Sequence, residues 1–372
     1  MSYQTITSHR VMALDAVRNR AYHDALARII TPDSVVLDLG AGTGVLGLMA
    51  ARLGARRVYL VEPTSIISVA EASVAANGLD QVVRCLRGRI EDVDIPEPVD
   101  VIVSVMTGNF LLNEDLLPVL FAARDARLAP GGHLLPGAAV MEAALVSAPG
   151  VHATHVAAWS TPQFGVSLDP GRALAANAVL YAPEGLSGAT FLSDTAALLS
   201  MDFRTAGYEP LAATVTFEVT QAGECHGIAG WFRIHLGDTW LSTSPAAPRT
   251  HWSPAFLPID PPLAVVPGQQ VTLSLNRQPR GDWSWRLRSG SEVRRHSTLL
   301  SMPMDADALL KASRSYVPAR TDDVATTGFV LAAVDGVRDA SSIAASLQAR
   351  FPERFASVEA ALEFTQAVLA RF

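Results

Sequence analysis

A glycine-rich turn near the N-terminus constrains this chain more than any other feature. Residues 35–44 read VVLDLGAGTG, an aliphatic run that leads into glycines at positions 40, 42 and 44. A short apolar run of this kind is typical of a buried strand. Glycine lets a ligand approach the backbone closely, and the first turn of a following helix offers free N–H groups. We therefore expect a strand, a turn and a helix that together bind a ligand.

The segments on either side of this turn alternate between two patterns. Short β-branched runs at 57–62, 82–88 and 99–105 are separated by stretches with helical spacing, and Gly54 and Gly78 stand where helices should stop. This alternation predicts βαβ units on a parallel sheet. Residues 1–135 are thus expected to form N-terminal helices followed by a Rossmann-like α/β domain.

Three acidic positions refine the prediction for the ligand. Asp38 ends the first strand, the turn reads G-x-G-x-G instead of G-x-G-x-x-G, and Glu62 ends the second strand about twenty residues later, where a carboxylate can accept from ribose hydroxyls. This combination favours the methyltransferase version of the nucleotide-binding fold over nicotinamide or flavin sites. Glu91 follows the third strand and could accept from an adenine amino group. The predicted cofactor residues here are Asp38, Gly40, Gly42, Gly44, Glu62, Gly88, Arg89 and Glu91.

The rest of the chain changes pattern twice. Residues 136–312 show short alternating strands with frequent Pro and Gly, which predicts an antiparallel β-barrel or sandwich. Within it, residues 155–200 are rich in Ala and Leu and are expected to form an inserted helical arm. Residues 313–323 resemble a linker, and residues 323–372 carry three helical patterns, a small helical or winged-helix module.

Composition excludes several function classes. The net charge of −7 argues against nucleic acid as the main partner, because phosphate binding needs a concentrated basic face. Cys85 and Cys225 have no disulfide-framework or metal-ligand spacing, so no metal is expected. The first residues lack an apolar signal core, and no run reaches the ~18 apolar residues of a membrane span. We expect a cytoplasmic protein without a membrane partner.

Four ordered stretches resemble the protein arginine methyltransferases, over residues 9–305. They are an N-terminal pattern, the glycine turn with its acidic positions, a loop in the place of the family's "double-E" loop, and a Thr-His-Trp loop. The matching residues are His9, Met12, Asp15, Arg18 and Tyr22; 35–44 with Glu62 and 88–91; 104–117; and Thr250, His251 and Trp252. The resemblance implies the α/β domain followed by a β-barrel, with S-adenosyl-L-methionine as cofactor and S-adenosyl-L-homocysteine as product.

The same resemblance implies roles for individual residues. Arg18 would pair with the methionine carboxylate of the cofactor, since a guanidinium suits bidentate carboxylate binding. Met12 would pack near the sulfonium as a polarizable neighbour. The arm at 155–200 would mediate dimerisation, so a homodimer is expected.

The loop at 104–117 departs from the family pattern. The family uses two glutamates to bind the substrate guanidinium; the second corresponds to Glu114, but the first position is Val105. Valine accepts no hydrogen bond, and nearby aromatic positions are Met106 and Asn109. We therefore expect a substrate other than a standard arginine, in a pocket lined by Val105, Met106, Asn109 and Trp252.

His251 and Asp15 both match the family, which places them in contact. A carboxylate-oriented imidazole is a good general base, so this pair could assist proton loss from the acceptor while Glu114 orients it. The alternative is that His251 and Asp15 only tie the N-terminal helix to the barrel, and the sequence leaves both open. The predicted catalytic residues are Glu114, His251 and Asp15.

The tail resembles the small PqqD-like domains that capture leader peptides. The likeness rests on VDGVR at 334–338 and on the spacing of Ile343, Ala344, Leu347, Phe351 and Pro352. A stabilising helical appendage remains the alternative. The sequence therefore predicts a methyltransferase that N-methylates a peptide or peptide-derived natural product. Its alternatives are a small-molecule O- or N-methyltransferase, a genuine arginine methyltransferase with one glutamate, and a non-catalytic scaffold.

Overall fold

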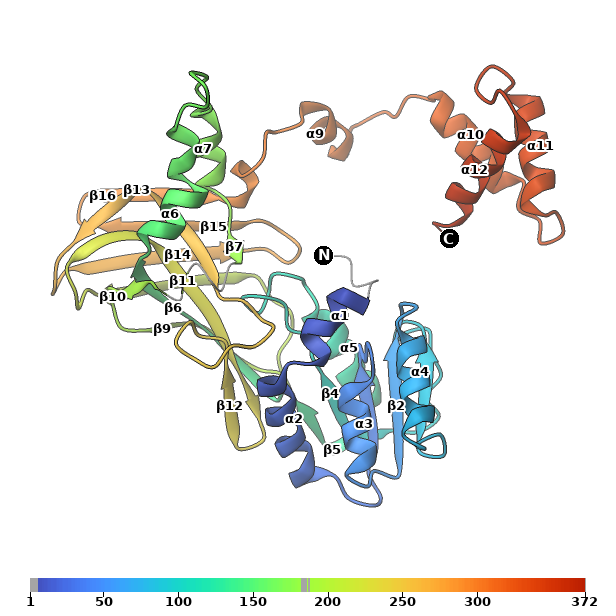
Figure 1. Cartoon of the computed structure of the whole chain (residues 1–372), viewed down its shortest axis with the longest axis horizontal. Helices are drawn as coiled ribbons and strands as arrows, with labels where there is room; N and C mark the ends of the chain where they lie inside the picture. Colours follow the sequence, from blue (N-terminus) through green and yellow to red (C-terminus); the bar gives the residue numbers. More distant parts are fainter. Residues whose placement is uncertain (1–5, 182–185, 187, 372) are drawn as a thin grey trace. The chain divides into compact units, whose positions relative to one another are not determined.

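The computed structural model describes residues 6–181, 186 and 188–371. It divides into two compact units, Met1–Pro303 and Met304–Phe372 (Figure 1). The first unit holds both the α/β part and the β-rich part of the chain, and one cluster of buried apolar side chains runs through both parts.

A five-stranded parallel sheet forms the N-terminal part of the first unit. Its strand order is β3-β2-β1-β4-β5, which confirms the predicted Rossmann-like domain. The strands are β1 (Val35–Leu39), β2 (Arg57–Glu62), β3 (Val83–Arg87), β4 (Val99–Ser104) and β5 (Leu128–Leu135). The helices are α1 (Ile6–Ala13), α2 (Ala16–Ile29), α3 (Val45–Arg52), α4 (Ile67–Ala76) and α5 (Leu117–Arg127).

The order of this sheet decides where a ligand can bind. The strand sequence reverses between β1 and β4, and ligands of open α/β sheets bind at the carboxyl ends of strands at such a point. All five residues of β1 are buried, as the apolar run predicts. The glycine turn follows β1 directly, and the loop at 105–116 follows β4, so the fold places these two segments at the same edge.

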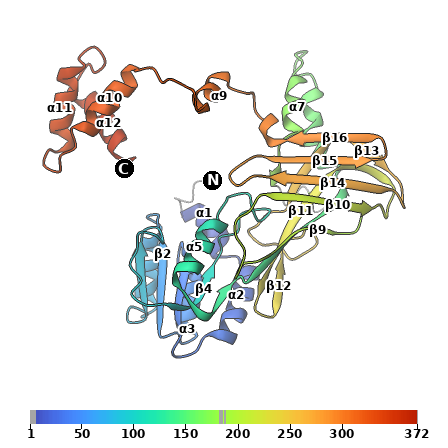
Figure 2. The same cartoon turned by 180° about the vertical axis from the view of Figure 1, so that it is seen from behind.

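Antiparallel strands form the second part of the first unit (Figures 1 and 2). One sheet has the order β7-β13-β11-β6-β8, with β12 on β11 and β9 on β6; the other has the order β10-β14-β15-β16. Together they make the β-barrel-like domain that the sequence predicts. The strands are β6 (Ala138–Ser147), β7 (Leu180–Tyr181), β8 (Thr190–Phe191), β9 (Ala196–Asp202), β10 (Leu211–Glu218), β11 (Gly223–Leu236), β12 (Thr239–Ser242), β13 (Ala255–Val265), β14 (Gln270–Arg277), β15 (Trp283–Ser289) and β16 (Glu292–Ser297).

The predicted helical arm at 155–200 is wrong in its extent. The described helical segments of this insert include α6 (Pro149–His155), the 3-10 turn η1 (Ala157–Ser160) and α7 (Pro170–Ala175). From residue 180 the chain returns to the sheets as β7, β8 and β9, because pairing with β13 and β6 overrides the helical preference of the Ala- and Leu-rich segment. Residues 182–185 and 187 of the predicted arm lie outside the described residues.

The second unit consists of helices. They are α9 (Ala306–Ala312), α10 (Asp322–Ala332), α11 (Ala340–Arg350) and α12 (Val358–Leu369), and the last three share a small apolar core. No strand occurs in the described part of this unit, so the helical alternative holds and the winged-helix alternative is wrong. By its contacts this unit begins at Met304, whereas the sequence analysis ended the β-rich domain at residue 312 and began the helical module at residue 323.

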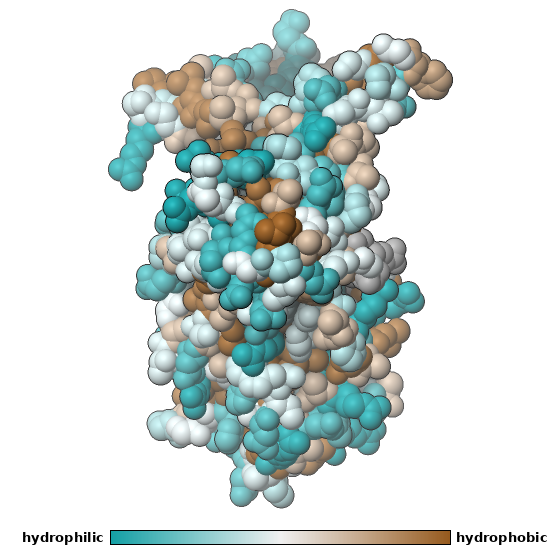
Figure 3. Space-filling view, turned by 90° about the vertical axis from the view of Figure 1, so that its left-hand side faces the viewer, coloured by the Kyte–Doolittle hydropathy of each residue, from teal (hydrophilic) through white to brown (hydrophobic). Residues whose placement is uncertain are grey.

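Surface composition adds little to these assignments. The face shown in Figure 3 carries hydrophilic residues among scattered hydrophobic ones, as most protein surfaces do. No helix among the described residues is long and apolar enough to cross a membrane.

Candidate cofactor and acceptor site

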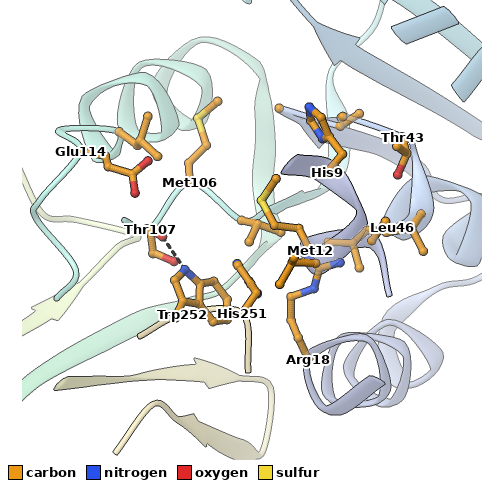
Figure 4. Close-up of a pocket in the computed structure, with 18 of the residues that line it drawn as sticks. His9, Met12, Arg18, Thr43, Leu46, Met106, Thr107, Glu114, His251 and Trp252 are labelled. Carbon is orange, nitrogen blue, oxygen red and sulfur yellow. Dashed lines mark hydrogen bonds between the residues drawn. The ribbon is translucent and has the colours of Figure 1, made fainter. Parts of the chain in front are cut away.

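A cavity of about 800 Å³ lies at the edge where the glycine turn and the loop after β4 meet (Figure 4). This volume falls within the range of small-molecule and cofactor pockets. In Figure 4, His9, Met12, Arg18, Thr43 and Leu46 lie on one side of the cavity, and Met106, Thr107 and Glu114 lie on the other. We call these the cofactor side and the acceptor side. His251 and Trp252 lie between them.

The glycine turn supplies backbone to the cofactor side. Gly40 and Gly42 line the cavity and have φ values of 70° and 56°, a region that favours glycine. A Cβ at Gly40 would lie 2.9 Å from Met106 Cε, and a Cβ at Gly42 would lie 3.1 Å from His9 Nδ1. The turn therefore needs glycine both for its backbone conformation and for its close contacts.

Glu62, at the end of β2, is held in place by the turn and by the residue after Pro63. Its Oε2 accepts from the Gly42 N–H at 3.1 Å, and its Oε1 accepts from the Thr64 N–H at 2.9 Å and the Thr64 hydroxyl at 2.7 Å. The side chain is buried and lines the cavity. A carboxylate has about four acceptor positions, so Glu62 keeps capacity for a ligand hydroxyl.

Arg18 is a buried cation that no carboxylate pairs with directly among the described residues. Its guanidinium donates to Asn19 Oδ1 at 3.0 Å from Nε and 2.6 Å from Nη2, and within the described chain it makes no ion pair with a carboxylate. Burial lowers the pKa of this guanidinium. A charge removed from water without an opposite charge is costly. Arg18 thus suits a ligand that brings a carboxylate into the cavity.

Asp38 lines the cavity and also holds the start of α3 against β1. Its Oδ2 accepts from the Gly47 N–H at 2.8 Å, which fastens the first turn of α3 to the end of β1. Burial raises the pKa of Asp38 to about 7, while the Gly47 hydrogen bond and the Arg18 charge oppose the rise. Together, Glu62, Arg18 and the glycine turn offer acceptors for hydroxyls, a cation for a carboxylate and open backbone, which fits an amino acid–nucleoside cofactor.

The predicted pair of His251 and Asp15 is in contact. Asp15 Oδ2 accepts from the His251 N–H at 2.7 Å and from His251 Nδ1 at 2.9 Å, while Asp15 Oδ1 accepts from the Arg18 N–H at 2.9 Å as the N-cap of α2. Burial lowers the pKa of the His251 imidazole, and the hydrogen bond to Asp15 raises it without cancelling that effect. His251 is therefore neutral near pH 7 with its proton on Nδ1, and it lines the cavity.

The acceptor side combines apolar and polar side chains. Trp252 donates through its indole N–H to the Thr107 carbonyl at 2.7 Å, and Asn109 Oδ1 accepts from the Ser253 N–H at 2.9 Å. These bonds join the loop after β4 to the Thr-His-Trp loop. These loops line the cavity with Val105, Met106, Thr107, Asn109, Glu114, Leu116, Trp252 and Ser253, and Tyr181 of β7 joins them. Glu114 is the carboxylate among these described residues.

The loop that carries Glu114 adopts unusual backbone angles. Phe110, Leu111 and Asp115 have φ values of 50°, 60° and 52°, which non-glycine residues rarely adopt. A Cβ at Gly108 would lie 2.9 Å from the Glu114 N atom, so the two ends of the loop pack directly together. Such strained backbone persists only where surrounding contacts hold it.

Asp115 provides the contacts that hold this loop. Its carboxylate accepts from Arg277 Nη1 at 2.9 Å and Nη2 at 2.6 Å, from the Arg280 N–H at 2.9 Å, and from the Tyr208 hydroxyl. Burial raises the pKa of Asp115, but the hydrogen bonds from Arg277 and Tyr208 outweigh it and lower the pKa to about 2. Arg277 lies on β14, so a barrel strand anchors the residue next to Glu114.

Several predicted residues do not line the cavity. Gly44 faces α4 and β2, since its Cβ would lie 2.9 Å from Leu60 Cδ1, and Asp15 lies behind His251. Gly88, Arg89 and Glu91 also lie outside the lining, and the last two are exposed. Their predicted roles remain predictions.

Other residues of the cavity were not predicted. Tyr181 and Leu116 line it, and the buried Tyr181 and Thr107 hydroxyls have no hydrogen-bond partner among the described residues. Thr107 and Leu116 could have been found as neighbours of Glu114, whereas no sequence pattern marks Tyr181. In the described part of the chain, no group of three His, Cys, Asp or Glu side chains is arranged to hold a metal ion.

Comparison with known proteins identifies the family. Residues 36–132 match the model of the methyltransferase domain, and residues 138–289 match that of the arginine methyltransferase oligomerization subdomain. Protein arginine N-methyltransferase 6 of Xenopus laevis is 32% identical over 290 residues, which cover 74% of this chain and 85% of that protein. This chain belongs to the protein arginine N-methyltransferase family. It is accordingly an enzyme, a methyltransferase that uses S-adenosyl-L-methionine.

Further relatives agree with this assignment. The probable protein arginine N-methyltransferase 6 of Arabidopsis thaliana is 30% identical over 326 residues, covering 74% of this chain and 75% of that one. The Trypanosoma brucei PRMT1 enzyme-prozyme complex with AdoHcy superposes with a TM-score of 0.70 at 25% identity, covering 80% of this chain and 99% of that chain. Arabidopsis protein arginine methyltransferase 10 shares the fold, with a TM-score of 0.68 at 24% identity over the same shares. Residues 304–372 of this family member lie beyond both family matches.

Proposed function

We propose that this protein N-methylates a nitrogen in a peptide or peptide-derived natural product, and that standard protein arginine is not its acceptor. The observation that carries the proposal is the acceptor side of the cavity, where Glu114 is the one carboxylate among the residues that the structure describes. Val105, which the family resemblance aligns with the first glutamate, lines the cavity with Met106 and Leu116. A guanidinium bound there would lose one charged partner, at a cost of about 1–3 kcal/mol.

The cofactor side supports a specific binding arrangement. Glu62 would accept from the ribose hydroxyls, Arg18 would pair with the methionine carboxylate, and Met12 would pack against the sulfonium. The 88–91 loop, with Glu91, would border the adenine. When bound, the cofactor supplies an electrophilic methyl group. The protein's part is to align the acceptor nitrogen with it, which can account for a large share of the rate.

Glu114 would orient the acceptor nitrogen, and His251 would accept its proton. Glu114 faces the cavity and would accept a hydrogen bond from the acceptor N–H, which fixes the direction of the nitrogen lone pair. His251 keeps Nε2 free of its proton because Nδ1 donates to Asp15, so Nε2 could accept a proton that the acceptor sheds. The alternative role, that this pair only ties α2 to the barrel, would leave the rate insensitive to His251.

Restoring the missing acid tests the specificity argument. With a pooled peptide library and labelled cofactor, we expect Val105→Glu to raise methylation of arginine peptides about tenfold to a few hundredfold, because a buried charged donor regains its partner. Val105→Gln has similar size without the charge and should gain much less. Wild-type protein that already methylates arginine peptides as fast as Val105→Glu would contradict the proposal.

The C-terminal unit supports a peptide as the acceptor. Its helices α10, α11 and α12 share their own core, and the predicted likeness to peptide-binding domains would make it a recruiting module. Deleting residues 304–372 should raise the KM for a long peptide about tenfold or more, because tethering raises its effective concentration. Cofactor affinity should not change. An unchanged KM would favour a small-molecule substrate.

The helical insert supports a homodimer. Trp159, Phe164 and Leu168 are exposed apolar side chains on it, and Phe164 is fully exposed at the tip of a tight turn. Exposed apolar side chains grouped in this way are typical of interaction surfaces. The dimer would cover them with the partner subunit.

A further inference from the structure

The outer face of the four-stranded sheet is polar and carries exposed arginines on β15 and on the edge strand β16. Along this face, cross-strand neighbours form rows, and the register gives one row as Thr214, Ser274, Arg286 and Arg295, and the next as Thr216, Thr272, Arg288 and Val293. The opposite face of β15 is buried through Trp283, Trp285 and Leu287. The arginines therefore stand on the solvent side of strands whose other side forms the core.

Three arginines gather there without acidic partners. Arg286, Arg288 and Arg295 are exposed, and Arg286 and Arg295 are direct cross-strand neighbours. Arg286 Nη2 donates to Ser274 Oγ at 3.3 Å, while no described residue forms a hydrogen bond or ion pair with the side chain of Arg288 or Arg295. We call these three residues the arginine face. The adjacent Arg294, by contrast, pairs with Glu292 at 2.8 Å.

An excess of basic residues in the chain does not explain the arginine face. The chain has 29 basic and 36 acidic residues, yet the charges of the two rows are all positive. Like charges directly opposite one another destabilise a sheet. A carboxylate at the position of Arg295 would have paired with Arg286 instead. An anionic ligand on this face would relieve the repulsion between the arginines.

We propose that the arginine face docks an acidic, extended segment of the substrate peptide, at a distance in sequence from the methylated residue. This inference rests on the proposed peptide substrate. Arg286 and Arg288 are two residues apart on one strand, so their side chains repeat every ~6.6 Å. Alternate side chains of an extended peptide repeat at the same spacing, so acidic residues at i and i+2 would match them. Ser274, Thr272 and Thr216 offer hydroxyls beside the charges.

Direct binding tests the docking surface without requiring methylation. A fluorescein-labelled peptide of alternating Glu and Ser should bind the full-length protein at low salt, as measured by anisotropy, and should weaken as salt is added. Arg286→Thr/Arg288→Thr should weaken binding about tenfold, since exposed ion pairs contribute a few-fold each. Threonine suits a strand and keeps the face polar. Thermal unfolding should show that this double variant is folded.

A matched variant separates this surface from a general charge effect. Arg84→Thr/Arg87→Thr removes two exposed arginines from strand β3 and should bind the probe like the wild type. The inference would be overturned if both double variants lost the same affinity for the peptide probe, or if Arg286→Thr/Arg288→Thr lost none. So would tight binding of single-stranded oligonucleotide in place of the acidic peptide. Probe binding that persists while no peptide is methylated would contradict the proposed function instead.

Discussion

Replacing Glu114 with glutamine is expected to slow methyl transfer about 100- to 1,000-fold while leaving cofactor affinity unchanged. Glutamine keeps the size of the side chain, so the contact between Gly108 and the Glu114 backbone is preserved. It removes the negative charge that would face the acceptor nitrogen. The rate should be measured in single-turnover experiments on the best acceptor from the peptide library.

The control for Glu114→Gln is the same change at an exposed position. Glu71 lies on α4 and is exposed, so Glu71→Gln should transfer methyl groups at the wild-type rate. Binding of S-adenosylhomocysteine should be equal in the wild type and both variants. A Glu114→Gln enzyme with the wild-type rate would show that this carboxylate does not act on the acceptor.

Replacing Asp115 with asparagine is expected to lower the free energy of unfolding by about 3 kcal/mol, the usual cost of breaking a buried ion pair by removing one partner. Arg277 is buried and would lose its carboxylate. Asparagine tolerates the positive φ of this position, so the effect reports the lost charge and not the backbone. The turnover of Asp115→Asn should also fall about 100-fold, because Glu114 is displaced from its position.

Asp202→Asn provides the comparison, since Asp202 pairs with Arg204 on the surface and should contribute less than about 1 kcal/mol. The pH dependence gives a second readout. The pKa of Asp115 is lowered from 3.8 to about 2, so its stabilisation is present above pH 3.8 and is lost as the pH falls towards 2. The stability of Asp115→Asn should not show this particular decrease between pH 3.8 and 2. Equal stabilities for Asp115→Asn and Asp202→Asn in urea unfolding would contradict the proposed anchoring of the loop.

The sequence predicted those parts of the site that depend on local pattern. Gly40, Gly42 and Glu62 follow from the order strand, turn, helix, strand, because the carboxyl ends of neighbouring parallel strands must meet. The contact between His251 and Asp15 spans 236 positions and could be predicted only through the family resemblance.

Contacts that depend on three-dimensional pairing escaped the sequence analysis. Arg277 reaches Asp115 across 162 positions, and although Asp115 lies in the loop at 104–117, no sequence motif marks Arg277 as its partner. Tyr181 reaches the cavity because β7 pairs with β13, in a segment whose composition favours helix. The extent of the helical insert was wrong for the same reason, since sheet pairing and not local propensity decides the structure after residue 180.

Isothermal titration of the full-length protein with S-adenosylhomocysteine tests the assignment of the cofactor side most directly. We predict micromolar binding by the wild type and by Val105→Glu, and binding weakened about 30- to 100-fold in Arg18→Met and in Glu62→Gln, since each loses a hydrogen bond to a charged group. Circular dichroism should show that these variants remain folded. The assignment of the cofactor side would be contradicted if the folded wild type did not bind S-adenosylhomocysteine, or if all four proteins bound it equally.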